Sequence, residues 1–152
     1  MTGLVALLGD PVSHSLSPRM HHAAFKALGL DLRYLAFRVD AAHFSEALRG
    51  LKALGAAGVN VTVPHKERAF ALADEVTPEG VRCGAVNAVT FERGSLVGHN
   101  TDSAAIRGAL EDLGALGGPA LLLGTGGAAR AAAGALADRG ADPVYIAGRD
   151  LK

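Results

Sequence analysis

The chain has 152 residues, of which 49% are hydrophobic and 20% charged, enough to fold as one domain or as one domain and part of another. Fifteen basic and fifteen acidic residues cancel, which excludes a basic footprint for nucleic acid, and no apolar run is long enough to cross a bilayer. The only cysteine, Cys83, excludes an internal disulfide and is typical of a reducing compartment. With no secretory signal at the N-terminus, we expect a cytoplasmic protein with neither a nucleic-acid nor a membrane partner.

Apolar runs alternate with helical patterns along the chain, and this alternation predicts a mostly parallel sheet with right-handed crossovers. The first helix is expected to bury a face that contains Met20, Ala24, Ala27 and Leu28. In chain order we predict a strand at 4–8, a helix at 18–28, a strand at 34–39, a helix at 44–54, a strand at 59–63, a helix at 66–75, strands at 85–91 and 96–99, a helix at 102–114, a strand at 120–123, a helix that ends near Asp138, and a strand at 144–147.

The stretch GDPVSHSLSP, residues 9–18, connects the first predicted strand to the first predicted helix. Its composition predicts a turn with Ser17 as the helix N-cap and Pro18 at the first helical position. Such a turn places hydroxyl groups beside backbone N–H groups, an arrangement that suits a carboxylate.

Polar residues interrupt two apolar runs in the middle of the chain. In NVTVPHK, Asn60 and Thr62 share one strand face, which is either functional or belongs to an exposed sheet face or an edge strand. Lys66 follows the carboxyl end of that strand, where open α/β sheets bind ligands, although a surface lysine is the commoner case. Asn87 requires hydrogen-bond partners if it is buried, and Asp102 begins a helix, where a capping role is the default.

The stretch LLLGTGGAAR, residues 121–130, fits the pattern G-x-G-x-x-G/A between a predicted strand and a predicted helix. Such a turn lets backbone N–H groups approach a pyrophosphate at the helix N-terminus, and the alternative is a glycine-rich turn without a ligand. At the end of the next strand, Arg149 favours the 2′-phosphate of NADP, whereas Asp150 favours the free 2′-hydroxyl of NAD.

Five ordered motifs, GDPVSHSLSP, NVTVPHKE, GAVNAV, GHNTD and GTGGAAR, together resemble those of the shikimate dehydrogenases over essentially the whole chain. The resemblance implies an α/β protein with a mostly parallel, three-layer substrate domain followed by the first βαβ unit of a Rossmann-type nucleotide domain. The corresponding boundaries are 1–101 for the substrate-binding and catalytic domain, 102–118 for a connecting helix and linker, and 119–152 for a truncated dinucleotide-binding domain.

The resemblance also implies an enzyme of chorismate and aromatic amino-acid biosynthesis that reversibly reduces 3-dehydroshikimate to shikimate with NADPH. Lys66 and Asp102 would then be the catalytic pair. Ser15 and Ser17 would bind the substrate carboxylate, and the substrate hydroxyls would be held by Asn60, Thr62, Lys66, Asn87 and Asp102. The cofactor would be bound by Gly124, Gly126, Gly127, Ala128, Arg130 and Arg149.

Several alternatives accompany this interpretation. The family's strand-end segment N-R-T is here Gly148-Arg149-Asp150, so NAD remains an alternative to NADP. A quinate/shikimate dehydrogenase that uses NAD, and a non-catalytic sensor of pathway metabolites, are the rival functions. No metal site is expected, because the six histidines lack metal-binding spacing, and His21 and His22 are read as ordinary helix-surface residues.

The family's nucleotide domain continues well beyond residue 152, so the chain is expected to be a fragment of a longer enzyme, monomeric or homodimeric. Residues 119–152 are too few for an independent core. On this interpretation the isolated 1–152 segment binds cofactor weakly and turns over poorly.

Overall fold

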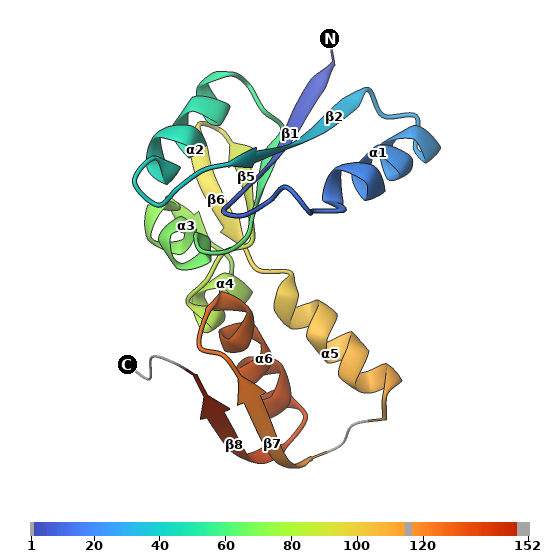
Figure 1. Cartoon of the computed structure of the whole chain (residues 1–152), viewed down its shortest axis with the longest axis vertical. Helices are drawn as coiled ribbons and strands as arrows, with labels where there is room; N and C mark the ends of the chain where they lie inside the picture. Colours follow the sequence, from blue (N-terminus) through green and yellow to red (C-terminus); the bar gives the residue numbers. More distant parts are fainter. Residues whose placement is uncertain (1, 115–116, 149–152) are drawn as a thin grey trace.

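A computed structural model describes residues 2–114 and 117–148, which form two units connected by one helix (Figure 1). The N-terminal unit contains β1 (Gly3–Gly9), α1 (Ser17–Ala27), β2 (Leu32–Arg38), α2 (Phe44–Ala53), β3 (Gly58–Val61), α3 (Lys66–Leu72), β4 (Glu75–Val76), α4 (Pro78–Cys83), β5 (Ala88–Glu92) and β6 (Ser95–His99). The helix α5 (Asp102–Asp112) leads to the C-terminal unit, which contains β7 (Gly118–Leu123), α6 (Gly127–Asp138) and β8 (Ala141–Ala147). The predicted α/β class is confirmed.

The N-terminal unit is a three-layer sandwich around a six-stranded sheet with the order β2-β1-β3-β5-β6-β4. Only β5 runs opposite to the other strands. The helices α2 and α3 cover one face, where Phe44 and Leu48 pack on Val59 and Val61 of β3. The helix α1 covers the other face near Leu7 of β1. The strand β3 therefore lies in the middle of the sheet, which excludes the edge-strand alternative for Asn60.

One edge of this sheet collects the segments that carry the polar motifs. The strands β1, β3 and β6 are parallel, so the loops after Gly9, Val61 and His99 emerge at the same edge. The antiparallel β5 begins at this edge, directly after Asn87. The sheet topology therefore brings together four motifs that are up to about 90 residues apart in the sequence.

The predicted helix at 66–75 is too long, because α3 ends at Leu72. The backbone N–H of Leu96 donates to the Asp74 carboxylate at 2.8 Å, and the N–H of Asp74 donates to the Leu96 carbonyl at 2.9 Å. These bonds draw the chain into the short edge strand β4. The following helix α4 is absent from the prediction, although Thr77 and Pro78 at its start are a recognisable helix signal.

The expected apolar face of α1 is not buried. Met20 is 61% exposed and Leu28 is 70% exposed, so this part of the prediction is wrong. The helix contacts the sheet instead through Phe25 and His21, and the His21 ring stacks on Tyr34 with centroids 4.2 Å apart. The α1 helix also begins one residue earlier than predicted, since Leu16 is at the N-cap and Pro18 lies in the second helical position.

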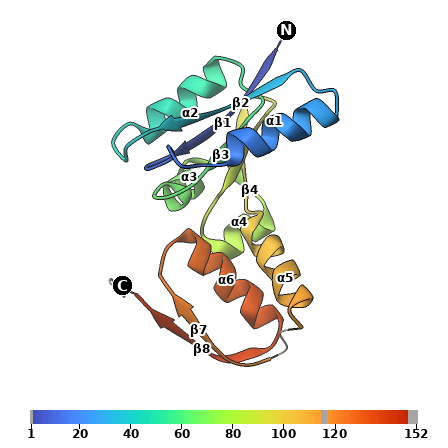
Figure 2. The same ribbon diagram turned by 45° about the vertical axis from the view of Figure 1, so that its right-hand side comes forward.

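The two units pack against each other where α6 lies against α5 and against α4 (Figure 2). Cys83, Ala85 and Ala131 form a small buried cluster with Ile106 at this joint. At its edge, the guanidinium of Arg82 donates to both carboxylate oxygens of Asp138. Arg107 of α5 adds a third bond to Asp138 at 3.1 Å, so one carboxylate ties together all three helices.

Within the described ranges, no helix is long and apolar enough to cross a membrane.

The Asp138 carboxylate is expected to keep the joint closed over Cys83. Burial raises the pKa of the Cys83 thiol, so the folded protein should react slowly with iodoacetamide near pH 7.5. We predict that Asp138→Asn accelerates this alkylation several-fold, because Arg82 and Arg107 lose their shared partner. The matched change Asp112→Asn, in α5, should leave the rate unaltered, and equal rates in both variants would contradict the prediction.

The stabilisation that the Asp138–Arg82 ion pair contributes depends on pH. The hydrogen bond from Arg82 lowers the pKa of Asp138 below its ordinary value of 3.8. A carboxyl with a lowered pKa in the fold contributes its full stabilisation above its unfolded pKa and loses it as the pH falls through the folded value. The joint should therefore stay closed at pH 5 and open only below about pH 4, as followed by hydrogen–deuterium exchange of the α4 and α6 amide groups, corrected for the pH dependence of the intrinsic exchange rate.

Candidate active site

A lysine–carboxylate pair lies at the carboxyl edge of the N-terminal sheet. The Nζ of Lys66 donates to Oδ2 of Asp102 at 2.6 Å, and the Lys66 side chain is 15% exposed. Lys66 is the first residue of α3, and Asp102 is the first residue of α5. Two charges this poorly hydrated are stable only if they are paired, so the two helix starts hold each other in place.

Asn87 fixes the second oxygen of this carboxylate. Its Nδ2 donates to Oδ1 of Asp102 at 2.7 Å and to the hydroxyl of Thr101 at 2.9 Å. The Asn87 Oδ1 accepts from the backbone N–H of Thr101 at 3.0 Å. The interruption of the apolar run at Asn87 is thereby explained: its carboxamide sets the direction in which Asp102 faces Lys66.

The turn that precedes Lys66 is held by buried contacts. The His65 side chain is buried, stacks on Phe44 at 4.5 Å, and contacts the Val39 carbonyl through Nε2 at 2.6 Å. The carbonyl of Lys66 accepts from the backbone N–H of Val86 at 2.9 Å, which links this turn to the Asn87 loop. The backbone of Lys66 is therefore fixed independently of its ammonium group.

The serine loop packs closely against the segment after β3. A methyl group at Gly9 would overlap the Thr62 side chain and lie 2.9 Å from Val12, so only glycine allows this approach. The Ser15 hydroxyl accepts from the backbone N–H of Ser17 at 3.2 Å, whereas Ser17 makes no capping bond of its own. The capping role predicted for Ser17 is thus wrong, and Ser15 satisfies that backbone group.

Tyr34 connects two of the predicted site residues and is absent from the sequence prediction. Its hydroxyl donates to Oδ1 of Asn60 at 2.8 Å, which leaves the amide N–H groups of Asn60 free to face a ligand. Burial raises the pKa of Tyr34, and a hydrogen bond from Ser17 acts in the opposite direction. A buried tyrosine in a strand is an ordinary core residue by its sequence pattern, so no local signal marks this role.

The two adjacent histidines of α1 support Tyr34, which corrects their interpretation as ordinary surface residues. The Nε2 of His22 accepts the backbone N–H of Tyr34 at 2.9 Å, while His21 stacks on the phenol ring. Burial, followed by the neighbouring His22, lowers the pKa of His21, so the stacked ring is favoured in its neutral form.

A cavity of about 700 Å³ lies between the segment that contains Lys66 and the glycine turn of the C-terminal unit. It is lined by Thr62, Val63, Pro64, Lys66 and Glu67 on one side and by Leu123, Gly124, Gly126, Gly127, Ala128 and Ala129 on the other. Methyl groups at Gly124 and Gly126 would meet no atom within 4 Å, so this side of the turn is an open cradle at the N-terminus of α6. A cradle of this kind fits the phosphates of a dinucleotide.

The remaining predicted cofactor residues lie elsewhere. Arg130 is half exposed and forms an ion pair with Glu67 at 3.4 Å, at the outer edge of the cavity. Arg149, and Asp150 beside it, fall outside the described residues.

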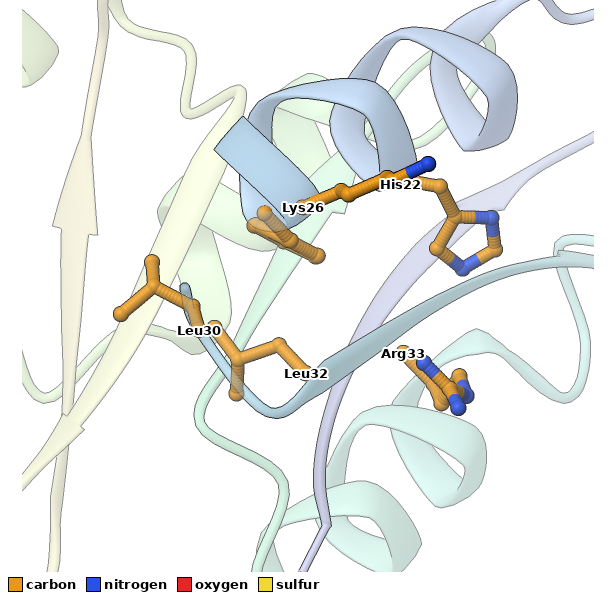
Figure 3. Close-up of a pocket in the computed structure, with 6 residues that line it drawn as sticks. His22, Lys26, Leu30, Leu32 and Arg33 are labelled. Carbon is orange, nitrogen blue, oxygen red and sulfur yellow. The ribbon is translucent and has the colours of Figure 1, made fainter. Parts of the chain in front are cut away.

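A second cavity of about 470 Å³ lies between α1 and β2, and His22 is one of the residues that line it (Figure 3). Its lining residues are His22, Phe25, Lys26, Leu30, Leu32 and Arg33, none of which the sequence places in the site. Over residues 2–114 and 117–148, no group of three or more His, Cys, Asp or Glu side chains could hold a metal ion.

A mostly parallel sheet with a lysine–carboxylate pair at its carboxyl edge, facing a dinucleotide-type glycine turn, is the arrangement of a two-unit α/β protein whose second unit begins as a nucleotide-binding fold. The model of the shikimate dehydrogenase substrate binding domain matches residues 7–89, more than half of the chain. The chain belongs to the shikimate dehydrogenase family.

The relatives agree in sequence and in fold. The NADP(+) shikimate dehydrogenase of Moorella thermoacetica is 53% identical over 97% of this chain and 51% of its own length. The crystal structure of shikimate dehydrogenase 1 from Peptoclostridium difficile superimposes with a TM-score of 0.93 at 35% identity, covering 98% of this chain and 57% of that one. The Thermus thermophilus enzyme, in complex with NADP(H) and shikimate, gives 0.86 at 44% identity, covering 97% and 56%. The chain thus spans about half the length of these relatives.

A negative charge introduced at position 87 is expected to destabilise the folded protein. We predict that Asn87→Asp places a second carboxylate against Oδ1 of Asp102 and lowers the free energy of unfolding at pH 7 by about 1–3 kcal/mol. The repulsion raises the pKa of the introduced carboxyl in the folded state, so its cost falls as the pH decreases toward 4. Urea unfolding at pH 7 and pH 4.5 would measure this, and an equal loss at both values would contradict it.

Tyr34 is expected to matter through its hydroxyl group alone. We predict that Tyr34→Phe keeps the ring stacked on His21 but lowers the free energy of unfolding by about 1 kcal/mol, since Asn60 loses its donor. The control Tyr145→Phe, on an exposed ring of β8, should change stability far less in the same urea titration. Equal effects of the two substitutions would show that the Tyr34–Asn60 bond contributes nothing.

Proposed function

We propose that the protein containing this chain reversibly reduces 3-dehydroshikimate to shikimate with NADP as its cofactor. The observation that carries the proposal is the Lys66–Asp102 pair, 2.6 Å apart, beside a cavity whose other wall is the open glycine turn. Relatives that are named as NADP(+) shikimate dehydrogenases support it over nearly the whole chain.

The chemistry requires a proton donor at the substrate carbonyl. Bound NADPH would supply a hydride to the carbonyl carbon, which leaves negative charge on the oxygen. Lys66 can stabilise this charge and donate a proton from Nζ, and Asp102 holds the ammonium in position through Oδ2. In the oxidation direction, the neutral amine of Lys66 takes the proton of the substrate hydroxyl.

The remaining residues would hold the substrate. Ser15 and Ser17 would bind its carboxylate at the turn before α1, and Asn60, Thr62, Asn87 and Asp102 would bind its hydroxyl groups. Tyr34 supports this arrangement because it fixes the Asn60 oxygen and directs the amide N–H groups away from itself. A sensor would need only these contacts, whereas a partly buried lysine with a fixed carboxylate partner favours an enzyme.

The glycine turn would hold the cofactor through Gly124, Gly126, Gly127 and Ala128, with Arg130 at its edge. Arg149 would contact the 2′-phosphate. We further propose the division into a substrate domain at 1–101, a connection at 102–118 and a nucleotide domain from 119. A cytoplasmic monomer or homodimer that acts on small molecules, without nucleic acid or membrane, completes the proposal.

The assay uses the full-length protein with 3-dehydroshikimate and either NADPH or NADH, followed by the loss of reduced cofactor. Oxidation of NADPH in preference to NADH supports the proposal. Preference for NADH, together with oxidation of quinate, would identify the rival NAD-dependent enzyme. Binding of shikimate without any cofactor oxidation would identify a sensor.

Lys66 is expected to act in turnover more than in binding. We predict that Lys66→Ala lowers kcat by about 10²–10⁴-fold, the usual contribution of a positioned proton donor, with a much smaller change in the Kd for shikimate. The control Lys26→Ala removes a lysine on α1 outside the site and should leave both values unchanged. Full turnover by the Lys66→Ala variant would show that Lys66 is not the proton donor.

A further inference from the structure

Two adjacent glycines at the start of α6, the N-cap Gly126 and the first helical residue Gly127, have different surroundings. A methyl group at Gly127 would lie 3.0 Å from Cβ and 3.2 Å from Cδ of Lys66, and 3.2 Å from Cβ of Ala85. A methyl group at Gly126 would meet nothing within 4 Å. Gly126 therefore faces the open cradle, whereas Gly127 faces the lysine of the other unit.

Backbone conformation does not explain either glycine. Gly126 is extended, with φ −79° and ψ −176°, and Gly127 begins the helix α6, so other residues could adopt both conformations. Gly124 differs, because its φ of +122° favours glycine whatever its surroundings. At Gly127 the constraint is space.

The neighbours of Gly127 have little room to move. Ala85 is fully buried, and its backbone N–H donates to the Gly80 carbonyl at 3.3 Å. Its own carbonyl accepts from Nδ2 of the buried Asn100 at 2.9 Å. A methyl group at Gly127 must therefore displace either the stem of Lys66 or the start of α6.

We propose that Gly127, in the C-terminal unit, is a positioning residue for Lys66 through direct packing against its side-chain stem. The lysine stem packs between Gly127 and its own helix while Nζ is bound to Asp102, so the ammonium has one favoured position. A lysine loses much side-chain freedom when it is fixed, and the backbone of Gly127 packed against the stem reduces the number of rotamers that the side chain can adopt. The inference rests on the proposed function and refines the cofactor role that the motif suggests for Gly127.

The expected effects separate the two glycines. Gly127→Ala should lower kcat about 10- to 100-fold, because small misplacements of a catalytic group cost this much, with little change in the Kd for NADP⁺. Gly126→Ala should raise the Kd for NADP⁺, since its methyl group enters the cradle, with a much smaller effect on kcat at saturating cofactor. The control Gly108→Ala, in α5 with nothing within 4 Å, should change neither.

Two further measurements distinguish positioning from a general structural effect. The rate at which trinitrobenzenesulfonate labels Lys66, read by mass spectrometry in the full-length protein without ligands, should rise in Gly127→Ala and not in Gly126→Ala. Ala85→Gly, added to Gly127→Ala, removes one of the opposing methyl groups and should restore part of kcat. A pure nucleotide role for Gly127 would be unaffected by a change at Ala85.

The outcomes are decisive in both directions. Unchanged labelling of Lys66 in Gly127→Ala, or a raised Kd for NADP⁺ with normal kcat at saturation, overturns the proposal. If Gly127→Ala does not fold, the labelling is measured on the Ala85→Gly/Gly127→Ala pair against Ala85→Gly alone. If the unaltered protein oxidises no shikimate with NADP⁺, the proposed function fails, while the labelling rates still decide whether Gly127 positions Lys66.

Discussion

The bond between Nζ of Lys66 and the carboxylate of Asp102 is the interaction on which the site depends. Both groups are largely removed from water, and an unpaired charge there would be costly. Asn87 fixes the carboxylate from the other side, and the Val86–Lys66 backbone bond fixes the start of α3. The pair therefore couples the ends of two helices to the loop before β5, so that its geometry is set by the sheet.

The reversed strand β5 makes this coupling possible. A purely parallel sheet would present only strand ends at its carboxyl edge, whereas an antiparallel neighbour also presents a strand start. Asn87 precedes β5 at that edge and faces Asp102, which follows β6 by three residues. The pairing of β5 with both β3 and β6 thus brings a carboxamide, a lysine and a carboxylate to one place.

Much of this could be predicted from sequence, because periodicity and turn residues are local. Strand–helix alternation predicts the class, and the period-two pattern around Asn60 correctly separates its side chain from the buried Val59 and Val61. The strand predicted at 59–63 is too long, because β3 ends at Val61 and Val63 beyond it is exposed. Short elements such as β4 escape prediction, since the bonds of Asp74 to Leu96 join residues 22 apart.

Roles that arise from contacts between distant segments have no local signal. Tyr34 has the pattern of a core residue, and its bond to Asn60 depends on the pairing of both β2 and β3 with β1. The motif at Gly127 suggests a phosphate, but its neighbour is decided by how α6 packs on α4 and α5. The sequence identifies the motif residues with reactive or polar side chains, but it does not show which residues from distant segments hold them in position.

The residues that pack the two units together also determine the position of the Lys66 side chain. Gly127 has to be small because Ala85 cannot retreat, and Ala85 is held by Asn100, which also accepts the N–H of Ser103 in the first turn of α5. Ala85 also belongs to the buried cluster that Asp138 closes at its rim. Any motion that opens the cavity by swinging α6 away from α3 must therefore remove the wall behind Lys66. Under the proposed function, a ligand that drew the units together would restore that wall, so that its binding and the position of the Lys66 ammonium would be linked.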